Sequence, residues 1–122
     1  MDKKFDLIVV GGGFSGTCAA IEAARKGLCV LLVEKYNCLG GAPNNCLVMP
    51  FMNYWTKLGQ GEQFLTGDLF LEIVENLRQM GGIAENNKTF DEEILKIVLQ
   101  RMCIAAGVNL LFNTTIVDVE TE

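Results

Sequence analysis

The first apolar run of the chain is short, almost unbroken and followed at once by glycine. Residues 7–10 read Leu-Ile-Val-Val, which predicts a strand buried on both faces of a parallel sheet. Small apolar side chains dominate residues 15–26 and predict a helix that packs closely on the sheet, with Gly27 at its end. Residues 28–34 are again apolar up to a terminal acid. This pattern predicts a strand, a helix and a second parallel strand.

The middle of the chain follows a different pattern. Residues 36–63 show no regular period, and we expect a long loop there, which is unusual in a compact domain unless the loop is functional. Residues 68–80 carry apolar side chains at helical spacing, and Gly81 and Gly82 come directly after them. We therefore expect a helical insert before the third strand of the sheet.

The last third of the chain predicts one more helix and two strands. The sequence Thr89-Phe-Asp-Glu92 fits a capping box at the start of a helix over residues 91–105. Apolar residues then predict strands at 108–112 and 115–120.

These elements predict an α/β fold with the layout of a Rossmann-like domain. Right-handed crossovers place the parallel strands in the order 3-2-1, as part of a doubly wound sheet. We expect the last strand to begin a separate, small antiparallel layer. The first strand would leave an open edge, so we expect the chain to form a homodimer or to pair with the remainder of a longer chain.

The turn after the first strand carries the main chemical signal, because residues 11–16 read Gly-Gly-Gly-Phe-Ser-Gly. Gly11 permits a tight turn, Gly13 lets the backbone approach a pyrophosphate, and Gly16 lets the helix pack close to the sheet. A helix that begins near Ser15 directs its free N–H groups and its positive dipole end at the phosphates. This turn is therefore expected to bind a dinucleotide.

Glu34 ends the second strand and is the second part of the signal. A carboxylate at this place accepts hydrogen bonds from both hydroxyls of an adenosine ribose and repels a 2′-phosphate. Lys35 follows directly and weakens the argument against a 2′-phosphate. The alternative is a glycine-rich turn of some other α/β protein, with Glu34 merely solvated.

Two further short motifs, Leu39-Gly40-Gly41 and Pro50-Phe51-Met52, follow the second strand. Together with the glycine turn and Val33-Glu34-Lys35, they resemble the FAD-binding start of the glutathione reductase and succinate dehydrogenase superfamily. The bacterial FAD-dependent oxidoreductases look most similar. The resemblance covers residues 6–52 with specific motifs and the rest of the chain with weaker ones.

The resemblance implies where the cofactor lies. The Gly-Gly pair would contact the phosphates of FAD, residues 46–52 would lie near the flavin, and a late strand would meet the adenine. The cofactor-binding residues that we expect are Gly11, Gly13, Phe14, Ser15, Gly16, Glu34, Lys35, Gly40, Gly41 and Ile116.

Composition excludes several kinds of function. The net charge of −5 argues against nucleic acid and anionic membranes as partners, and no apolar run is long enough to span a bilayer. The absence of histidine removes His-based metal sites and Ser-His-Asp triads, so we expect no metal site. Five cysteines without a CxxC motif read as reduced thiols of a cytoplasmic protein.

The sequence predicts little catalytic machinery of its own, because a flavin carries the hydride or electron chemistry itself. Cys46 is the one reactive candidate, although packing is its favoured role. Tyr54 and Trp55 are expected to cover the core. Flavoproteins of this type are several times longer than these 122 residues, so we expect the N-terminal part of an enzyme whose substrate domain is absent.

Three functions stay open at this point. The first is the FAD-binding portion of an oxidoreductase that acts on a small-molecule substrate. The second is a dinucleotide-binding fragment or subunit without catalysis of its own, and the third is an NAD-binding Rossmann protein. The long stretch after Gly41 favours FAD over NAD.

Overall fold

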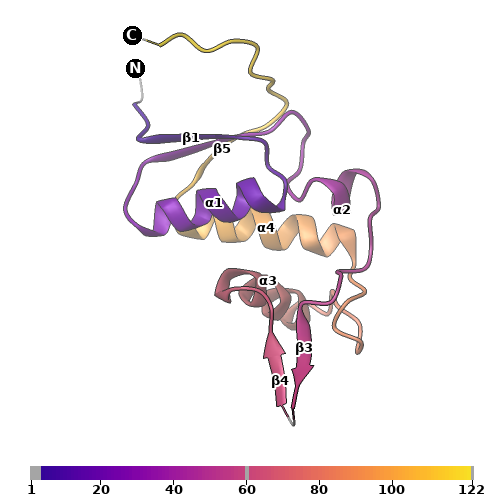
Figure 1. Ribbon diagram of the computed structural model, residues 1–122. Coiled ribbons are helices and arrows are strands. Elements are labelled where there is room, and N and C mark those ends of the chain that lie inside the picture. The colour runs from indigo at the N-terminus through magenta and orange to yellow at the C-terminus, as the bar shows by residue number, and fades with distance from the viewer. Residues whose placement is uncertain (1–3, 60, 122) are drawn as a thin grey trace.

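The computed structural model describes residues 4–59 and 61–121 as a three-stranded parallel sheet with helices packed on it (Figure 1). The strands run in the order β1-β2-β5, which confirms the α/β fold and the predicted order 3-2-1. The elements in chain order are β1 (Leu7–Val10), α1 (Phe14–Arg25), β2 (Val30–Val33), α2 (Ala42–Asn45), β3 (Trp55–Leu58), β4 (Gly61–Phe64), α3 (Asp68–Gln79), α4 (Glu92–Ala106) and β5 (Asn109–Leu111).

Helices α1 and α4 cover the same face of the sheet, and α3 packs on α4 beyond them (Figure 1). Two right-handed crossovers that proceed in the same direction along a sheet place both helices on one side. The core therefore lies between the sheet and α1 and α4, and then between α3 and α4. Its fully buried side chains include Ile21, Leu32, Ile73, Leu77, Leu95 and Leu99.

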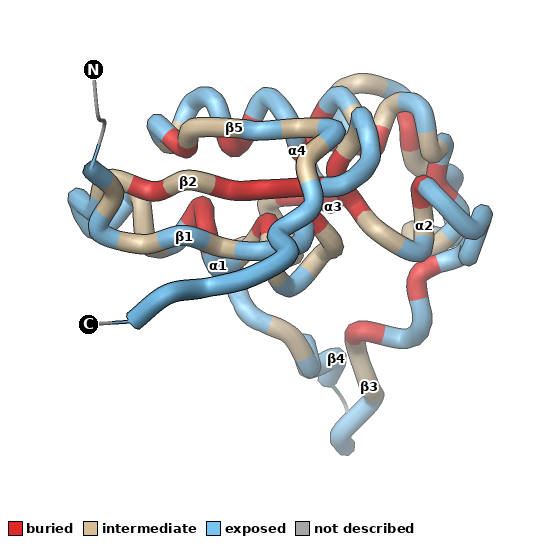
Figure 2. The backbone as a smooth tube through the Cα atoms, turned by 90° about the horizontal axis from the view of Figure 1, so that it is seen from above, coloured by how far each residue is buried: buried red, intermediate tan, exposed pale blue. Residues whose placement is uncertain are grey.

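The first strand is not buried on both faces, contrary to the sequence prediction. Ile8 is 53% exposed and Val10 is 64% exposed, whereas β2 lies in the middle of the sheet and is mostly buried (Figure 2). The side chains of Ile8 and Val10 point away from α1 and α4, and no described helix covers that face. One outer edge of β1 is also unpaired. An apolar run forms a strand that is buried on both faces only where other elements cover both faces of the sheet.

The predicted loop at residues 36–63 contains regular structure. It holds the single turn of α2 and then an antiparallel hairpin, in which Trp55 of β3 lies opposite Phe64 of β4. This hairpin is a separate two-stranded antiparallel sheet, whereas the antiparallel layer expected to begin at residues 115–120 does not form. Phe51, also within this segment, is buried against Phe70 and Phe90, with ring centroids 5.1 and 4.2 Å away.

The start of α4 differs from the predicted capping box. Asp91 is the N-cap, and its side chain accepts hydrogen bonds from the N–H groups of Glu93 and Ile94 at 2.9 and 3.0 Å. Thr89 lies two residues earlier, where its hydroxyl accepts from Asn86 in a turn. The Thr-x-x-Glu spacing was thus misleading, because an aspartate nearer the helix takes the cap.

No strand forms at residues 115–120, which was the other incorrect prediction of an element. The segment begins well anchored, because the N–H of Asn113 donates to Tyr36 and that of Thr114 donates to Glu34, both at 3.1 Å. Beyond it the chain runs exposed, with Val117 at 93% exposure. An apolar segment becomes a strand only where a neighbour accepts its backbone hydrogen bonds.

Candidate dinucleotide-binding site

The glycine turn between β1 and α1 has the geometry that its sequence predicts. Gly11 has a φ of +100°, a backbone conformation that residues other than glycine rarely adopt. A Cβ on Gly16 would lie 1.9 Å from the carbonyl oxygen of Gly11, so only glycine lets α1 start this close to the strand. Thr17 closes the turn by donating its hydroxyl to the Gly12 carbonyl at 3.1 Å.

Gly13 is the open position of this turn. It is the N-cap of α1 in extended conformation, and a Cβ added to it would meet no described atom within 4 Å. The cap has no side-chain hydrogen bond, and the first turn of α1 carries no acidic residue. The positive end of the helix dipole is therefore left for an external anion.

Glu34 is buried, with 6% of its surface exposed, and both of its carboxylate oxygens bind backbone N–H groups. Oε2 accepts from Gly12 at 2.5 Å and Oε1 accepts from Tyr36 at 2.9 Å. A carboxylate offers about four acceptor positions, so each oxygen keeps room for one more donor. Glu34 thus joins the end of β2 to the glycine turn and can still accept two hydroxyls.

The second glycine pair lies directly on the first. The N–H of Gly40 donates to the Gly12 carbonyl at 2.8 Å, and Gly13 and Gly40 form an isolated parallel bridge. A Cβ on Gly41 would come within 3.0 Å of the Gly13 Cα. The small size of Gly41 thus allows close contact between the two loops, in addition to any contact with phosphate.

Asn44 supports this second loop and was missed as a site residue. It is buried, and its side-chain N–H donates to the Leu39 carbonyl at 2.5 Å. A Cβ on Gly40 would lie 2.2 Å from the same nitrogen. No motif marks Asn44 as a support of this loop, because its contact with Leu39 depends on how the turn folds.

A hollow of about 180 Å³ opens beside the end of β1 and β2. It brings together four of the ten predicted cofactor residues: Gly11, Glu34, Lys35 and Ile116. Four residues that the sequence analysis did not select, Val10, Val33, Thr114 and Thr115, also line it. The two threonines reach the hollow because their segment is anchored to Glu34 and Tyr36, a contact between positions far apart in sequence.

Phe14, Ser15 and Cys46 lie outside this hollow. The Phe14 ring packs on Phe51 and Phe70, with centroids 5.7 and 6.1 Å away, so only its backbone N–H is free to serve the turn. Ser15 and Cys46 are exposed. The exposed segment around Cys46 is also strongly apolar, since Leu47 and Met52 are 63% and 84% exposed.

Two other kinds of site are not found in the part of the chain that the structure describes. No group of three or more cysteine or acidic side chains is placed to hold a metal ion. No helix among residues 4–59 and 61–121 is long and apolar enough to cross a bilayer.

Comparison with known proteins identifies one protein family over nearly the whole chain. The profile of the FAD dependent oxidoreductase family matches residues 6–122. Dihydrolipoyl dehydrogenase 3 of Haloarcula marismortui is 32% identical over 115 residues, which cover 89% of this chain and 22% of that protein. Vinyl phenol reductase of Lactiplantibacillus plantarum is 52% identical over 41 residues, 34% of this chain and 8% of that protein.

Solved structures show the same fold at low sequence identity. The THI4 protein of Thermovibrio ammonificans superposes with a TM-score of 0.52 at 15% identity, over 88% of this chain and 38% of that one. The halogenase PltM in complex with FAD gives a TM-score of 0.54 at 10% identity, over 98% of this chain and 30% of that one. The chain spans only a small part of the relatives that it matches.

Proposed function

This chain belongs to the FAD dependent oxidoreductase family, and we propose that residues 4–59 and 61–121 hold the adenosine diphosphate half of FAD for hydride or electron transfer by a longer enzyme. The observation that carries the proposal is the pairing of an uncapped, open Gly13 with a buried Glu34 that shares the same turn. One offers N–H groups to phosphate and the other offers acceptors to ribose.

Each part of the site has a separate task in this proposal. The first turn of α1 binds the pyrophosphate, and the Gly40–Gly41 loop fixes the position of that turn through the Gly12 carbonyl. Glu34 orients the ribose, and Ile116 and Thr115 line the hollow that accommodates the adenine. When bound, the flavin supplies the redox chemistry.

The substrate and the electron acceptor belong to the longer enzyme in this proposal. A non-catalytic dinucleotide-binding module is a second candidate, because the glycine turn and Glu34 account for nucleotide binding without a catalytic side chain. The five described cysteines are all free thiols, which supports a reducing compartment such as the cytoplasm. Turnover with an artificial electron acceptor separates the enzyme from the module.

The proposal is tested by titrating the purified 122-residue chain with FAD, FMN and NAD, following flavin fluorescence and retention on ultrafiltration. We expect saturable binding of FAD and much weaker binding of FMN, which lacks the adenosine half. The variant Gly13→Ala should bind FAD at least about tenfold more weakly, because its methyl group occupies the space of the phosphate.

Gly67→Ala is the matched control. Gly67 is also an extended N-cap without a side-chain bond, at the start of α3, and a Cβ on it would likewise meet no described atom within 4 Å. Its FAD affinity should equal that of the unmodified chain. Equal binding of FMN and FAD, a preference for NAD, or an unchanged affinity in Gly13→Ala would each reject the proposed site.

A further inference from the structure

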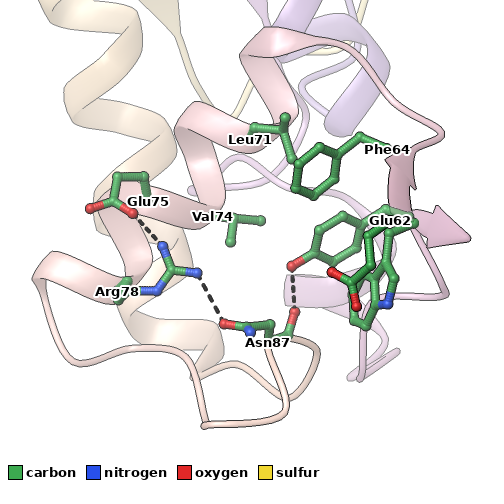
Figure 3. Close-up of a pocket in the computed structure, with 9 residues that line it drawn as sticks. Glu62, Phe64, Leu71, Val74, Glu75, Arg78 and Asn87 are labelled. Carbon is green, nitrogen blue, oxygen red and sulfur yellow. Dashed lines mark hydrogen bonds and ion pairs between the residues drawn. The ribbon is translucent and has the colours of Figure 1, made fainter. Parts of the chain in front are cut away.

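A second cavity lies far from the glycine turn, between the β3–β4 hairpin and α3 (Figure 3). Its volume of about 360 Å³ falls within the range of about 300–1,000 Å³ that is typical of small-molecule sites. No residue of the hollow at the end of β1 contributes to it. The cavity is therefore a separate candidate site, to which none of the preceding conclusions assigns a ligand.

One wall of this cavity is aromatic. The rings of Tyr54 and Phe64 are nearly parallel, at 10° and with centroids 6.5 Å apart, and Trp55 meets Tyr54 edge-on at 4.6 Å. Leu71 and Val74 of α3 form the apolar floor. Phe64 is 57% exposed, so one of these rings still has a free surface. Such walls favour a ligand that contains an aromatic ring.

Each charged side chain that lines the cavity lies near one of opposite sign. Arg78 forms an ion pair with Glu75 and donates to the Asn87 side-chain oxygen at 3.0 Å (Figure 3). Glu62 lies directly opposite Lys57 in the hairpin register, which puts both side chains on one face of the hairpin. No ion pair joins Glu62 to Lys57 among the described residues, but the two opposite charges lie side by side. A charged ligand would have to give up its hydration and would face both members of each pair, so its charge would gain little net attraction. The balance favours an uncharged ligand.

Lys88 lies beside the cavity wall at Trp55, and its ammonium is also engaged. Its ammonium lies 5.1 Å from the centroid of the Trp55 ring, a distance at which the ring attracts a cation. Because the Trp55 ring already attracts the Lys88 ammonium, this cation is less available to bind an anionic ligand.

Polar groups remain available for a neutral ligand. The Tyr54 hydroxyl donates to the Asn87 carbonyl at 2.7 Å, and burial raises the pKa of that hydroxyl, which keeps it neutral. The Asn87 side-chain N–H₂ and the Glu62 carboxylate have no hydrogen-bond partner among the described residues. Figure 3 shows the Glu62 carboxylate directed toward Asn87. One donor and one acceptor are thus placed at the same end of the cavity.

We propose that this cavity binds a small, uncharged aromatic molecule that carries an amide or hydroxyl group. The ring lies against Phe64 and Tyr54, and the polar group faces Asn87 and Glu62. The ligand holds the hairpin to α3, since these two elements supply opposite walls. The proposal does not depend on FAD binding.

Three matched probes test the charge preference: 3-phenylpropanamide, 3-phenylpropanoate and 3-phenylpropylamine, which share one ring and one chain length. Trp55 is the single tryptophan of the chain and lines the cavity, so its fluorescence reports binding directly. We expect saturable change with the amide and at least about tenfold weaker binding of both charged probes. The amide should also slow hydrogen exchange in β3 and β4.

Two hairpin variants test the location. Phe64→Leu should weaken amide binding roughly two- to tenfold, because one ring contact is lost. Leu65→Ala is the control, since Leu65 is exposed to a similar degree at 62% and does not line the cavity. Its affinity should be unchanged.

Several results would overturn the proposal. They are the absence of saturable Trp55 fluorescence change, stronger binding of either charged probe than of the amide, or equal losses in Phe64→Leu and Leu65→Ala. Self-association through the hairpin, detected by sedimentation and unaffected by the amide, would mean that a second copy occupies this surface. Loss of FAD binding would leave these outcomes untouched.

Discussion

At the scale of single residues, burial decides the chemistry of Cys103. Its side chain is completely buried in α4, and this desolvation raises the pKa of the thiol from 9.0 to about 12, with a smaller contribution from Cys18. In the unfolded chain the thiol loses its proton near pH 9, whereas in the folded chain it keeps it. The unfolded state therefore binds fewer protons between these two values, and stability falls as pH rises.

This gives a prediction for alkaline unfolding. Ionisation of Cys103 should leave the free energy of unfolding unchanged below pH 9, and should then lower it by up to about 1.4 kcal/mol for each pH unit toward pH 12. Urea titrations at several pH values measure it. Cys103→Ala should be less stable by about 1 kcal/mol at neutral pH but should show a smaller slope above pH 9. An identical slope in both proteins would contradict the burial argument.

The sequence alone proposes some residues of the candidate site and gives no sign of others. Gly11, Gly16 and Glu34 could be assigned because each task requires one residue type at one place in a strand–turn–helix unit. Thr114 and Thr115 could not, because the contact between Thr114 and Glu34 that places their segment joins positions far apart in sequence. Asn44 could not, because its hydrogen bond to Leu39 depends on how a local turn folds. Phe14 belongs to the motif by position, but its side chain serves the core.

At the scale of elements, the start of α4 offers a direct test of the cap. Asp91→Ala removes the acceptor of two backbone N–H groups and should lower the free energy of unfolding by about 0.5–2 kcal/mol. Thr89→Ala leaves the cap intact and should change it by no more than about 0.5 kcal/mol. Urea denaturation of the two variants measures the difference. A larger loss in Thr89→Ala would restore the predicted capping box.

The hairpin shows why the segment at 36–63 was predicted as a loop. Every residue of β4 is exposed, so β4 has no apolar alternation from which a strand could be recognised. Pairing of β3 with β4 and contact with α3 stabilise the hairpin instead. By contrast, α3 bears an apolar face that includes Ile73, Val74 and Leu77, and its bounds were predicted almost to the residue.

At the scale of the whole molecule, the unpaired edge of β1 is the feature most exposed to other chains. An unprotected apolar edge strand pairs readily with another copy. We expect the 122-residue chain to self-associate with increasing concentration. Ile8→Lys should reduce this association. The residue is 53% exposed, and the lysines of two associating copies would repel each other.

Sedimentation over a range of concentrations measures this association, with circular dichroism to compare the folds. Val117→Lys is a suitable control, since Val117 is 93% exposed and lies outside every strand. A monomer at all concentrations, or equal effects of the two lysines, would contradict the prediction.

The architecture itself was predictable from the sequence, because crossovers between parallel strands are right-handed and fix the order β1-β2-β5. The burial of β1 was not, since Ile8 and Val10 carry the composition of a covered strand while one face of the described sheet carries no helix. Apolar composition alone therefore does not tell whether a strand is covered on one face or on both.

The contact between the two glycine loops has a consequence for how such a sequence can change. Gly13 and Gly41 approach so closely that a side chain on Gly41 would press on the Gly13 backbone, and Gly40 is bonded to Gly12. Whether a substitution in one loop is tolerated therefore depends on the shape of the other loop. During evolution the two loops must vary together, although α1, β2 and the following turn separate them along the chain.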